Sequence, residues 1–189
     1  MISRLHNKIT MFFLKIKKGL SFGNNLKIKG RPIINISNKA SIKLGDNITL
    51  NSDNYGYHAN MHSPVKLMVD REGASIVVGD NTRINGACIH AYSSIEIGRN
   101  CLIAANVQII DANGHKLSFN DPSDRINTSS SGKPIIIEDN VWVGLNAIIL
   151  PGVTIGSGSV IGANTVVSEN VPPKCIFSGN PGQVIKNII

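Results

Sequence analysis

The sequence predicts an all-β solenoid, because three columns of a six-residue repeat run through residues 137–170. The first column is aliphatic and comprises Ile137, Val143, Ile149, Ile155, Ile161 and Val167. The column four places later holds small or slender residues, namely Val141, Ala147, Val153, Ser159, Thr165 and Val171. The column three places after the first holds only asparagine and glycine, at Asn140, Asn146, Gly152, Gly158, Asn164 and Asn170.

These columns fit short strands joined by tight turns and do not fit helices. Asparagine and glycine enter the left-handed backbone region at low cost, so a turn recurs every six residues. A helix with 3.6 residues per turn cannot keep one column apolar at a strict spacing of six. The repeat therefore indicates coils stacked along one axis, with the aliphatic column inside.

Composition and charge agree with this fold and narrow the range of partners. The 189 residues are enough for one domain with a continuous core. Hydrophobic residues make up 42% and aromatic residues only 5%, which is typical of a core of stacked Ile and Val. The net charge of +7 favours an anionic ligand or an anionic membrane surface. We expect no nucleic-acid partner, because the sequence has no helix-turn-helix, RNA-binding strand or zinc-finger spacing.

The three cysteines, Cys88, Cys101 and Cys175, indicate a reducing compartment. Their number is odd, and their spacing is not that of a metal site. Cys88 and Cys101 occupy the small-residue column, so we expect buried thiols there. The apolar run at residues 11–14 is too short for a signal peptide or a membrane span. We therefore expect a cytoplasmic protein.

Residues 1–22 are expected to form an amphipathic helix that precedes the solenoid of residues 23–189. One apolar stripe comprises Ile2, Leu5, Ile9, Phe12, Ile16 and Leu20. We expect this stripe to cap the first coil, since the end of a solenoid needs covering. Weak attachment of a basic helix to the cytoplasmic face of a membrane is the alternative.

The repeat begins at Leu26 with an irregular six-residue spacing and is interrupted twice. Residues 51–73 form either an irregular coil or an excursion that carries His58 and His62, for which we expect a surface or interface role rather than metal binding. After the register returns, His90 falls in or beside a buried column, so we expect a structural histidine with a polar partner.

The second interruption, residues 111–134, has the composition of a surface loop. It contains Gly114, Pro122, Gly132 and a serine run, and it also carries His115. Long loops inside compact domains are usually functional. The repeat then continues to the closing segment 172–189, which opens with two prolines.

Three pieces of this sequence resemble a known family. They are IGRNCLIAANVQIID with the following GH, then PIIIEDNVWVGLNAIILPGVTIGSGSVIGANTVVSENVP, and finally GNPGQVIK, and together they cover about residues 76–188. The chain is similar to the hexapeptide-repeat acyltransferases, and within them to the galactoside, maltose and polysaccharide O-acetyltransferases. The resemblance implies a left-handed parallel β-helix. It also implies a homotrimer with active sites between neighbouring solenoids and acetyl-CoA along the outer face.

The resemblance assigns the chemistry to His115 and Leu145. The family's loop histidine corresponds to His115, which would take the proton of a sugar hydroxyl. The hydroxyl oxygen then attacks the thioester carbonyl directly, without a covalent enzyme intermediate and without a metal. The backbone N–H of Leu145 matches the position that stabilises the oxyanion.

The resemblance implies binding roles for further residues. Asn85 matches an asparagine that holds the acceptor, and Asp111 and Arg125 are candidates for orienting His115 or the acceptor. An acidic acceptor ligand of the galactoside enzymes has no counterpart in this chain, where the sequence reads HAYSS, and this argues against a simple galactoside acceptor. The predicted contacts of acetyl-CoA are Trp142, Gly144, Gly162, Ala163 and Lys186.

The function predicted from these observations is acetyl-CoA-dependent O-acetylation of a sugar in a surface polysaccharide or its precursor. One alternative is N-acetylation of a nucleotide-linked amino sugar, although no G-x-G-x-x-G motif opens this chain. A metal hydratase on the same solenoid would need three converging histidines, and only His90 and His115 adjoin the matching region. The third alternative is a non-catalytic scaffold, in which His115 has no role.

Overall fold

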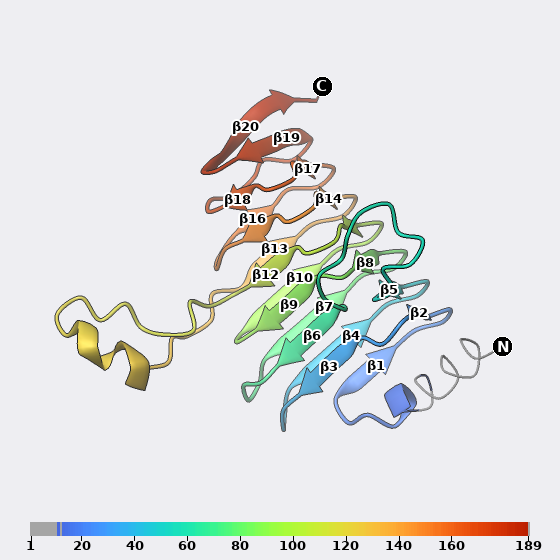
Figure 1. Cartoon of the computed structure of the whole chain (residues 1–189), viewed down its shortest axis with the longest axis horizontal. Helices are drawn as coiled ribbons and strands as arrows, with labels where there is room; N and C mark the ends of the chain where they lie inside the picture. Colours follow the sequence, from blue (N-terminus) through green and yellow to red (C-terminus); the bar gives the residue numbers. More distant parts are fainter. Residues whose placement is uncertain (1–10, 12, 189) are drawn as a thin grey trace.

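Three β-sheets wind around one axis in this computed structural model, which describes residue 11 and residues 13–188 (Figure 1). Sheet A contains β1 (Leu20–Phe22), β4 (Ser41–Leu44), β7 (Ser75–Val78), β10 (Ser94–Ile97), β13 (Ile135–Ile137) and β16 (Thr154–Ile155). Sheet B contains β2 (Lys27–Lys29), β5 (Thr49–Asn51), β8 (Arg83–Asn85), β11 (Leu102–Ile103), β14 (Trp142–Val143), β17 (Val160–Ile161), β19 (Cys175–Gly179) and β20 (Gly182–Asn187). Sheet C contains β3 (Ile33–Ile36), β6 (Lys66–Val69), β9 (Cys88–Ala91), β12 (Gln108–Ile110), β15 (Ile148–Ile149) and β18 (Val166–Val167).

The strands of each sheet come from successive coils, which confirms the predicted solenoid. Neighbouring strands pair in parallel, and the terminal β19–β20 pair is antiparallel. The aliphatic column passes from sheet to sheet: Ile137 pairs with Ile155 in sheet A, and Val143 pairs with Ile161 in sheet B. All members of the column are buried, so the core is a stack of aliphatic side chains along the axis.

Asparagine side chains hold the corners of the solenoid in register. At the corner between sheets A and B, the amide Nδ2 of one asparagine donates to the Oδ1 of the asparagine in the next coil, from Asn25 through Asn47, Asn81 and Asn100 to the last acceptor, Asn140. A second ladder joins Asn106, Asn146 and Asn164 between sheets B and C. All eight residues have φ between 57° and 63°, as the turn column predicts. Asn170, the last asparagine of the predicted turn column, has no positive φ and belongs to neither ladder. Its Oδ1 accepts a hydrogen bond from the N–H of Thr154.

The predicted N-terminal helix can be compared with the structure only in part, because most of its apolar stripe lies outside the described residues. Residues 13–15 are helical, and the buried Leu14 joins the core cluster, with Met11 packed against that cluster. Strand β1 lies inside the range 1–22 predicted for the helix, since Leu20 pairs with Ile42 of the next coil. No helix in the described part of the chain is long and apolar enough to cross a membrane.

The first interruption is shorter than the predicted range 51–73. Residues 52–65 leave the solenoid between β5 and β6 and are called here the excursion loop. Residues 66–69 return to the repeat as β6, which pairs with β3 and β9. Hydrogen bonds hold the excursion loop against the corner between sheets B and C: Asn106 Oδ1 accepts from the N–H of His62, and Asn106 Nδ2 donates to the carbonyl of Asn60.

The second interruption forms an arm, residues 111–134, between β12 and β13. It contains the short 3₁₀ helix η1 (Pro122–Asn127) and extends away from the solenoid, as the yellow segment of Figure 1 shows. At the C-terminal end, the buried side chains of Val171, Cys175 and Phe177 close the core.

Replacing Asn100 tests the corner ladder. Asn100→Ala should lower the free energy of unfolding by about 2 kcal/mol, because alanine is strained in the left-handed region and two side-chain hydrogen bonds are lost. Asn100→Gly keeps the backbone conformation and should cost about 1 kcal/mol. Urea unfolding of both variants measures the difference. Equal stability of the two variants would show that backbone strain at this corner is unimportant.

Candidate active site

A groove of about 500 Å³ runs across the outer face of sheet B. Six residues singled out in the sequence line this groove: Asn85, Trp142, Gly144, Leu145, Gly162 and Ala163. They come from successive coils, because the parallel register places β8, β11, β14 and β17 side by side. The structure therefore brings the predicted acceptor residue Asn85 and most of the predicted cofactor contacts to one surface.

Trp142 forms an apolar wall of this groove. It occupies an outward position of β14, in register with Leu102 of β11 and Val160 of β17. Its side chain is 52% exposed although it is large and hydrophobic. An exposed indole beside other apolar side chains is a suitable surface for an apolar part of a ligand.

The floor of the groove consists of backbone that admits no side chain. A Cβ at Gly144 would lie 2.8 Å from the backbone N of Ala163, and a Cβ at Gly162 would lie 2.8 Å from the Cβ of Ser178. The N–H groups of both glycines donate to carbonyls of the next coil. Within the described part of the chain, by contrast, the N–H of Leu145 has no hydrogen-bond acceptor. That donor is available to a ligand, as an oxyanion site requires.

The side chain of Asn85 is fixed at the other end of the groove. Its Oδ1 accepts a hydrogen bond of 3.2 Å from Asn51 Nδ2, and its Nδ2 donates one of 3.0 Å to the carbonyl of Ile103. A primary amide has two N–H donors, so one remains for an acceptor hydroxyl.

His115 lies on the arm and does not line this groove. Its Nδ1 is 3.0 Å from the backbone carbonyl oxygen of Thr128. Because a carbonyl oxygen only accepts hydrogen bonds, Nδ1 carries a proton in this contact, and in the neutral ring the lone pair is on Nε2. The exposed ring therefore presents a proton acceptor to its surroundings.

Other contacts within the arm hold Thr128 in place. Its Oγ1 accepts from the N–H of Lys116 and donates to the carbonyl of Arg125, both at 3.0 Å. The Nε of Arg125 donates to the carbonyl of Leu117 at 2.7 Å. Arg125 thus braces the arm, and its side-chain hydrogen bond goes to Leu117 rather than to His115.

Asp111 has a structural position that differs from its predicted role in orienting His115 or the acceptor. It is fully buried, and its carboxylate oxygens accept from the backbone N–H groups of Tyr92 and Ser93 at 2.6 and 2.8 Å. Its carbonyl accepts from the N–H of Lys133 at the other end of the arm. Burial raises the pKa of Asp111, while these N–H donors oppose the rise. The carboxylate fixes the base of the arm, where its hydrogen bonds go to Tyr92 and Ser93 rather than to His115, and Asp111 does not line the groove.

Replacing Asp111 tests this structural role. Asp111→Ala leaves two buried N–H groups without an acceptor and should lower the free energy of unfolding by about 2–4 kcal/mol. Asp121→Ala is the matched control, because Asp121 is exposed on the arm and caps η1 through Ser123. The control should cost about 1 kcal/mol or less. Thermal unfolding compares the two variants, and equal losses would refute the role assigned to Asp111.

Two further predicted residues lie outside the groove. Lys186 is exposed on β20, at the C-terminal end of sheet B, where it pairs with Ile176. His90 Nε2 is 3.2 Å from Asp70 Oδ1, and its ring packs on Tyr92, in agreement with a structural histidine. Among the described residues, no group of three or more His, Cys, Asp or Glu side chains is placed to hold a metal ion.

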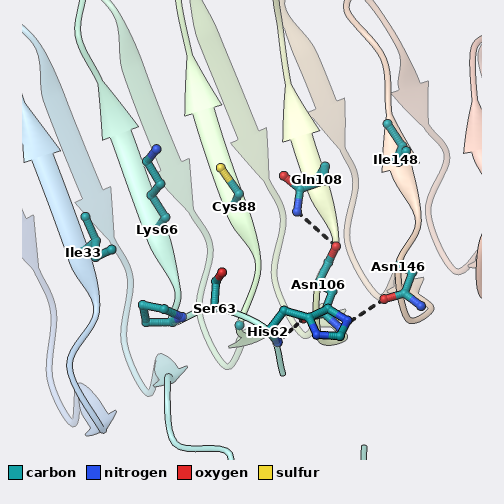
Figure 2. Close-up of a pocket in the computed structure, with 11 residues that line it drawn as sticks. Ile33, His62, Ser63, Lys66, Cys88, Asn106, Gln108, Asn146 and Ile148 are labelled. Carbon is teal, nitrogen blue, oxygen red and sulfur yellow. Dashed lines mark hydrogen bonds between the residues drawn. The ribbon is translucent and has the colours of Figure 1, made fainter. Parts of the chain in front are cut away.

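A second groove, of about 600 Å³, lies on sheet C and contains none of the predicted site residues. Figure 2 shows Lys66, Cys88 and Gln108 on adjacent strands along its floor, with His62 of the excursion loop at its edge. Burial raises the pKa of the Cys88 thiol, and nearby Lys66 opposes the rise. The excursion loop separates this groove from the one on sheet B.

Sequence reasoning missed the end of the sheet B groove that lies nearest the N-terminus. This end is lined by Tyr57 and His58 of the excursion loop and by Arg83 and Leu102 of the strands. The signal for Arg83 was present in the repeat, because Arg83 occupies the same outward column as Leu102 and Trp142. Tyr57 and His58 lie outside the repeat, so no column could have placed them.

Comparisons with known proteins agree with the repeat and the fold. The family described as "Hexapeptide repeat of succinyl-transferase" matches residues 75–110 and 134–169, on either side of the arm. A putative lipopolysaccharide biosynthesis O-acetyl transferase from Escherichia coli K12 is 33% identical over 158 residues, which are 80% of this chain and 74% of that protein. A putative acetyltransferase from Schizosaccharomyces pombe is 46% identical over 94 residues, which are 50% of this chain and only 44% of the relative.

A solved structure shows the same architecture with the expected cosubstrate. The hexapeptide-repeat-containing acetyltransferase from Vibrio cholerae, crystallised with acetyl-coenzyme A, is 33% identical with a TM-score of 0.55, and the match covers 65% of this chain and 67% of that one. The repeat, the parallel β-helix and these relatives together show that the chain belongs to the hexapeptide-repeat acetyltransferases, which have a left-handed parallel β-helix.

Proposed function

We propose that this protein transfers the acetyl group of acetyl-CoA to a hydroxyl of a sugar in a surface polysaccharide or its precursor. The observation that carries the proposal is the contact between His115 Nδ1 and the carbonyl of Thr128, which leaves Nε2 as a proton acceptor. The polysaccharide acceptor is supported by the relative from E. coli, which is named for lipopolysaccharide biosynthesis.

In the proposed reaction the groove holds acetyl-CoA and the arm supplies the base. The pantetheine would lie along Trp142 and the backbone of Gly162 and Ala163, with Lys186 near a phosphate. The thioester carbonyl would point at the N–H of Leu145. Such an arrangement places the reacting carbon beside a donor that stabilises negative charge as it develops.

The proposed chemistry is a direct displacement. The acceptor oxygen attacks the thioester carbonyl while Nε2 of His115 takes the hydroxyl proton. The tetrahedral oxyanion accepts a hydrogen bond from the N–H of Leu145. When the intermediate collapses, the C–S bond breaks, and the CoA thiolate receives the proton held by His115. The products are the acetyl ester and free CoA, and no group on the enzyme is acylated.

We further propose that each site is completed by a second copy of the chain, in a homotrimer. The groove lacks His115, whereas the arm that carries this residue extends from the solenoid (Figure 1). The arm also presents exposed hydrophobic side chains, with Leu117 55%, Phe119 77% and Ile126 81% exposed. Contact with a neighbouring solenoid would cover these side chains and bring His115 to that neighbour's groove.

Removing the base tests the reaction. His115→Gln should lower the release of CoA thiol from acetyl-CoA, measured with a panel of sugars and amino sugars, by about 10²–10⁴-fold. Binding of acetyl-CoA should be unchanged, because the groove is intact. His62→Gln is the control, since His62 is exposed at the edge of the groove on sheet C. Unchanged turnover in His115→Gln would favour a scaffold, and turnover restricted to amino sugars would favour N-acetylation.

Mixing two inactive variants tests the shared site. Ala163→Trp should block the groove without disturbing the core, because Ala163 is exposed. Co-expression with His115→Gln should restore activity, because some sites would combine an open groove with an intact histidine. Each variant expressed alone should stay inactive. Activity that does not return in the mixed oligomers would place His115 in the groove of its own chain.

A further inference from the structure

We propose that the acceptor sugar carries an anionic group, a carboxylate or a phosphate, which binds between Arg83 and His58 at the end of the sheet B groove nearest the N-terminus. The proposal rests on the proposed function, because it names the class of acceptor for that site.

The position of Arg83 is the first argument. Arg83 is in register with Leu102, and Leu102 is in register with Trp142, so all three side chains lie in one outward column of sheet B. Neighbouring strands are separated by about 4.8 Å, which places Arg83 about 10 Å from Trp142 along the axis. A sugar ring and an acetyl group fit that interval.

Asn85 connects this end of the groove to the reaction. Arg83 and Asn85 are two residues apart on β8, so their side chains leave the same face of the strand about 7 Å apart. The amide of Asn85 is fixed by Asn51 and Ile103 and retains one free donor. A sugar that places its hydroxyl at Asn85 therefore brings its neighbouring substituent within reach of the guanidinium of Arg83.

The charge of the lining is the second argument. His58 and Arg83 line the groove, and no acidic residue does so among the described residues. The carboxylates nearest in the sequence are engaged by backbone: Asp80 accepts from the N–H of Asp46, and Asp53 accepts from the N–H of Tyr55. Arg83 forms no ion pair with any described residue. A planar guanidinium without a carboxylate partner matches a carboxylate or a phosphate in geometry as well as in charge.

The excursion loop provides the opposite wall. The rings of Tyr57 and His58 lie 4.5 Å apart between centroids. The loop is held to the solenoid by Asn106, whose Oδ1 accepts from the N–H of His62 and whose Nδ2 donates to the carbonyl of Asn60. Burial raises the pKa of Tyr57, so its hydroxyl stays neutral and adds no negative charge to this end of the groove. The anionic group would then lie between a fixed aromatic wall and the strand that carries Arg83.

A matched set of ligands tests the proposal by direct binding. Galactose, galacturonic acid and galactose 6-phosphate share one ring and differ at C6. Isothermal titration of the whole protein, with acetyl-CoA absent, should show the two anionic sugars binding at least about tenfold tighter than galactose. Arg83→Gln should abolish this preference, and Arg83→Lys should retain part of it. Lys43→Gln is the control and should have no effect, because Lys43 is exposed on β4 of sheet A.

The outcomes separate this inference from the proposed function. Equal binding of the three sugars, no binding of any of them, or a preference that persists in Arg83→Gln would overturn the anionic subsite. Preference for galacturonic acid over the phosphate would identify an acidic sugar as the acceptor, and the reverse would identify a phosphorylated one. An intact preference without any release of CoA thiol would support the subsite and count against acetyl transfer.

Discussion

The structure depends on a turn that lets every coil repeat the backbone path of the coil before it. Asparagine makes this possible in two ways, because it tolerates the left-handed conformation and its amide bonds to the same residue one coil away. The ladder from Asn25 to Asn140 extends across five coils in this manner. Since each coil keeps the same path, side chains at equivalent positions stack in straight columns, inside the solenoid and outside it.

The straight outer columns of side chains form a groove on the surface of this repetitive fold. On sheet B the column of Arg83, Leu102 and Trp142 forms one line of the groove, and close coil-to-coil contact at Gly144 provides a floor of backbone. The two interruptions both leave the solenoid at corners. A loop that departs at a corner does not break the hydrogen bonding of any sheet, and the strands before and after it can remain in register.

The columns of the repeat explain how much could be predicted from the sequence. The buried aliphatic residues and the turn residues follow from position within a six-residue unit, whereas the groove residues from Asn85 to Ala163 were predicted from the resemblance to the family. The role of Asp111 does not follow from the repeat, because a carboxylate near a loop histidine suggests a catalytic partner as readily as a structural one. Only the fold shows that the backbone amides of Tyr92 and Ser93 surround it. Strand β6 was missed because Lys66 follows an irregular loop of unpredictable length.

The difference between positions that the repeat fixes and positions that it leaves free also bears on how an acceptor can be selected in the proposed reaction. Inward and turn positions are fixed by the solenoid, and the glycine floor is fixed by the distance between coils. Outward positions and the interruptions are free of both constraints. Tyr57, His58 and Arg83 are of this unconstrained kind and sit at one end of the groove, whereas the floor at Gly144 and Gly162 lies toward the other. A change of acceptor can therefore be encoded at one end while the coils that would hold acetyl-CoA stay as the fold requires.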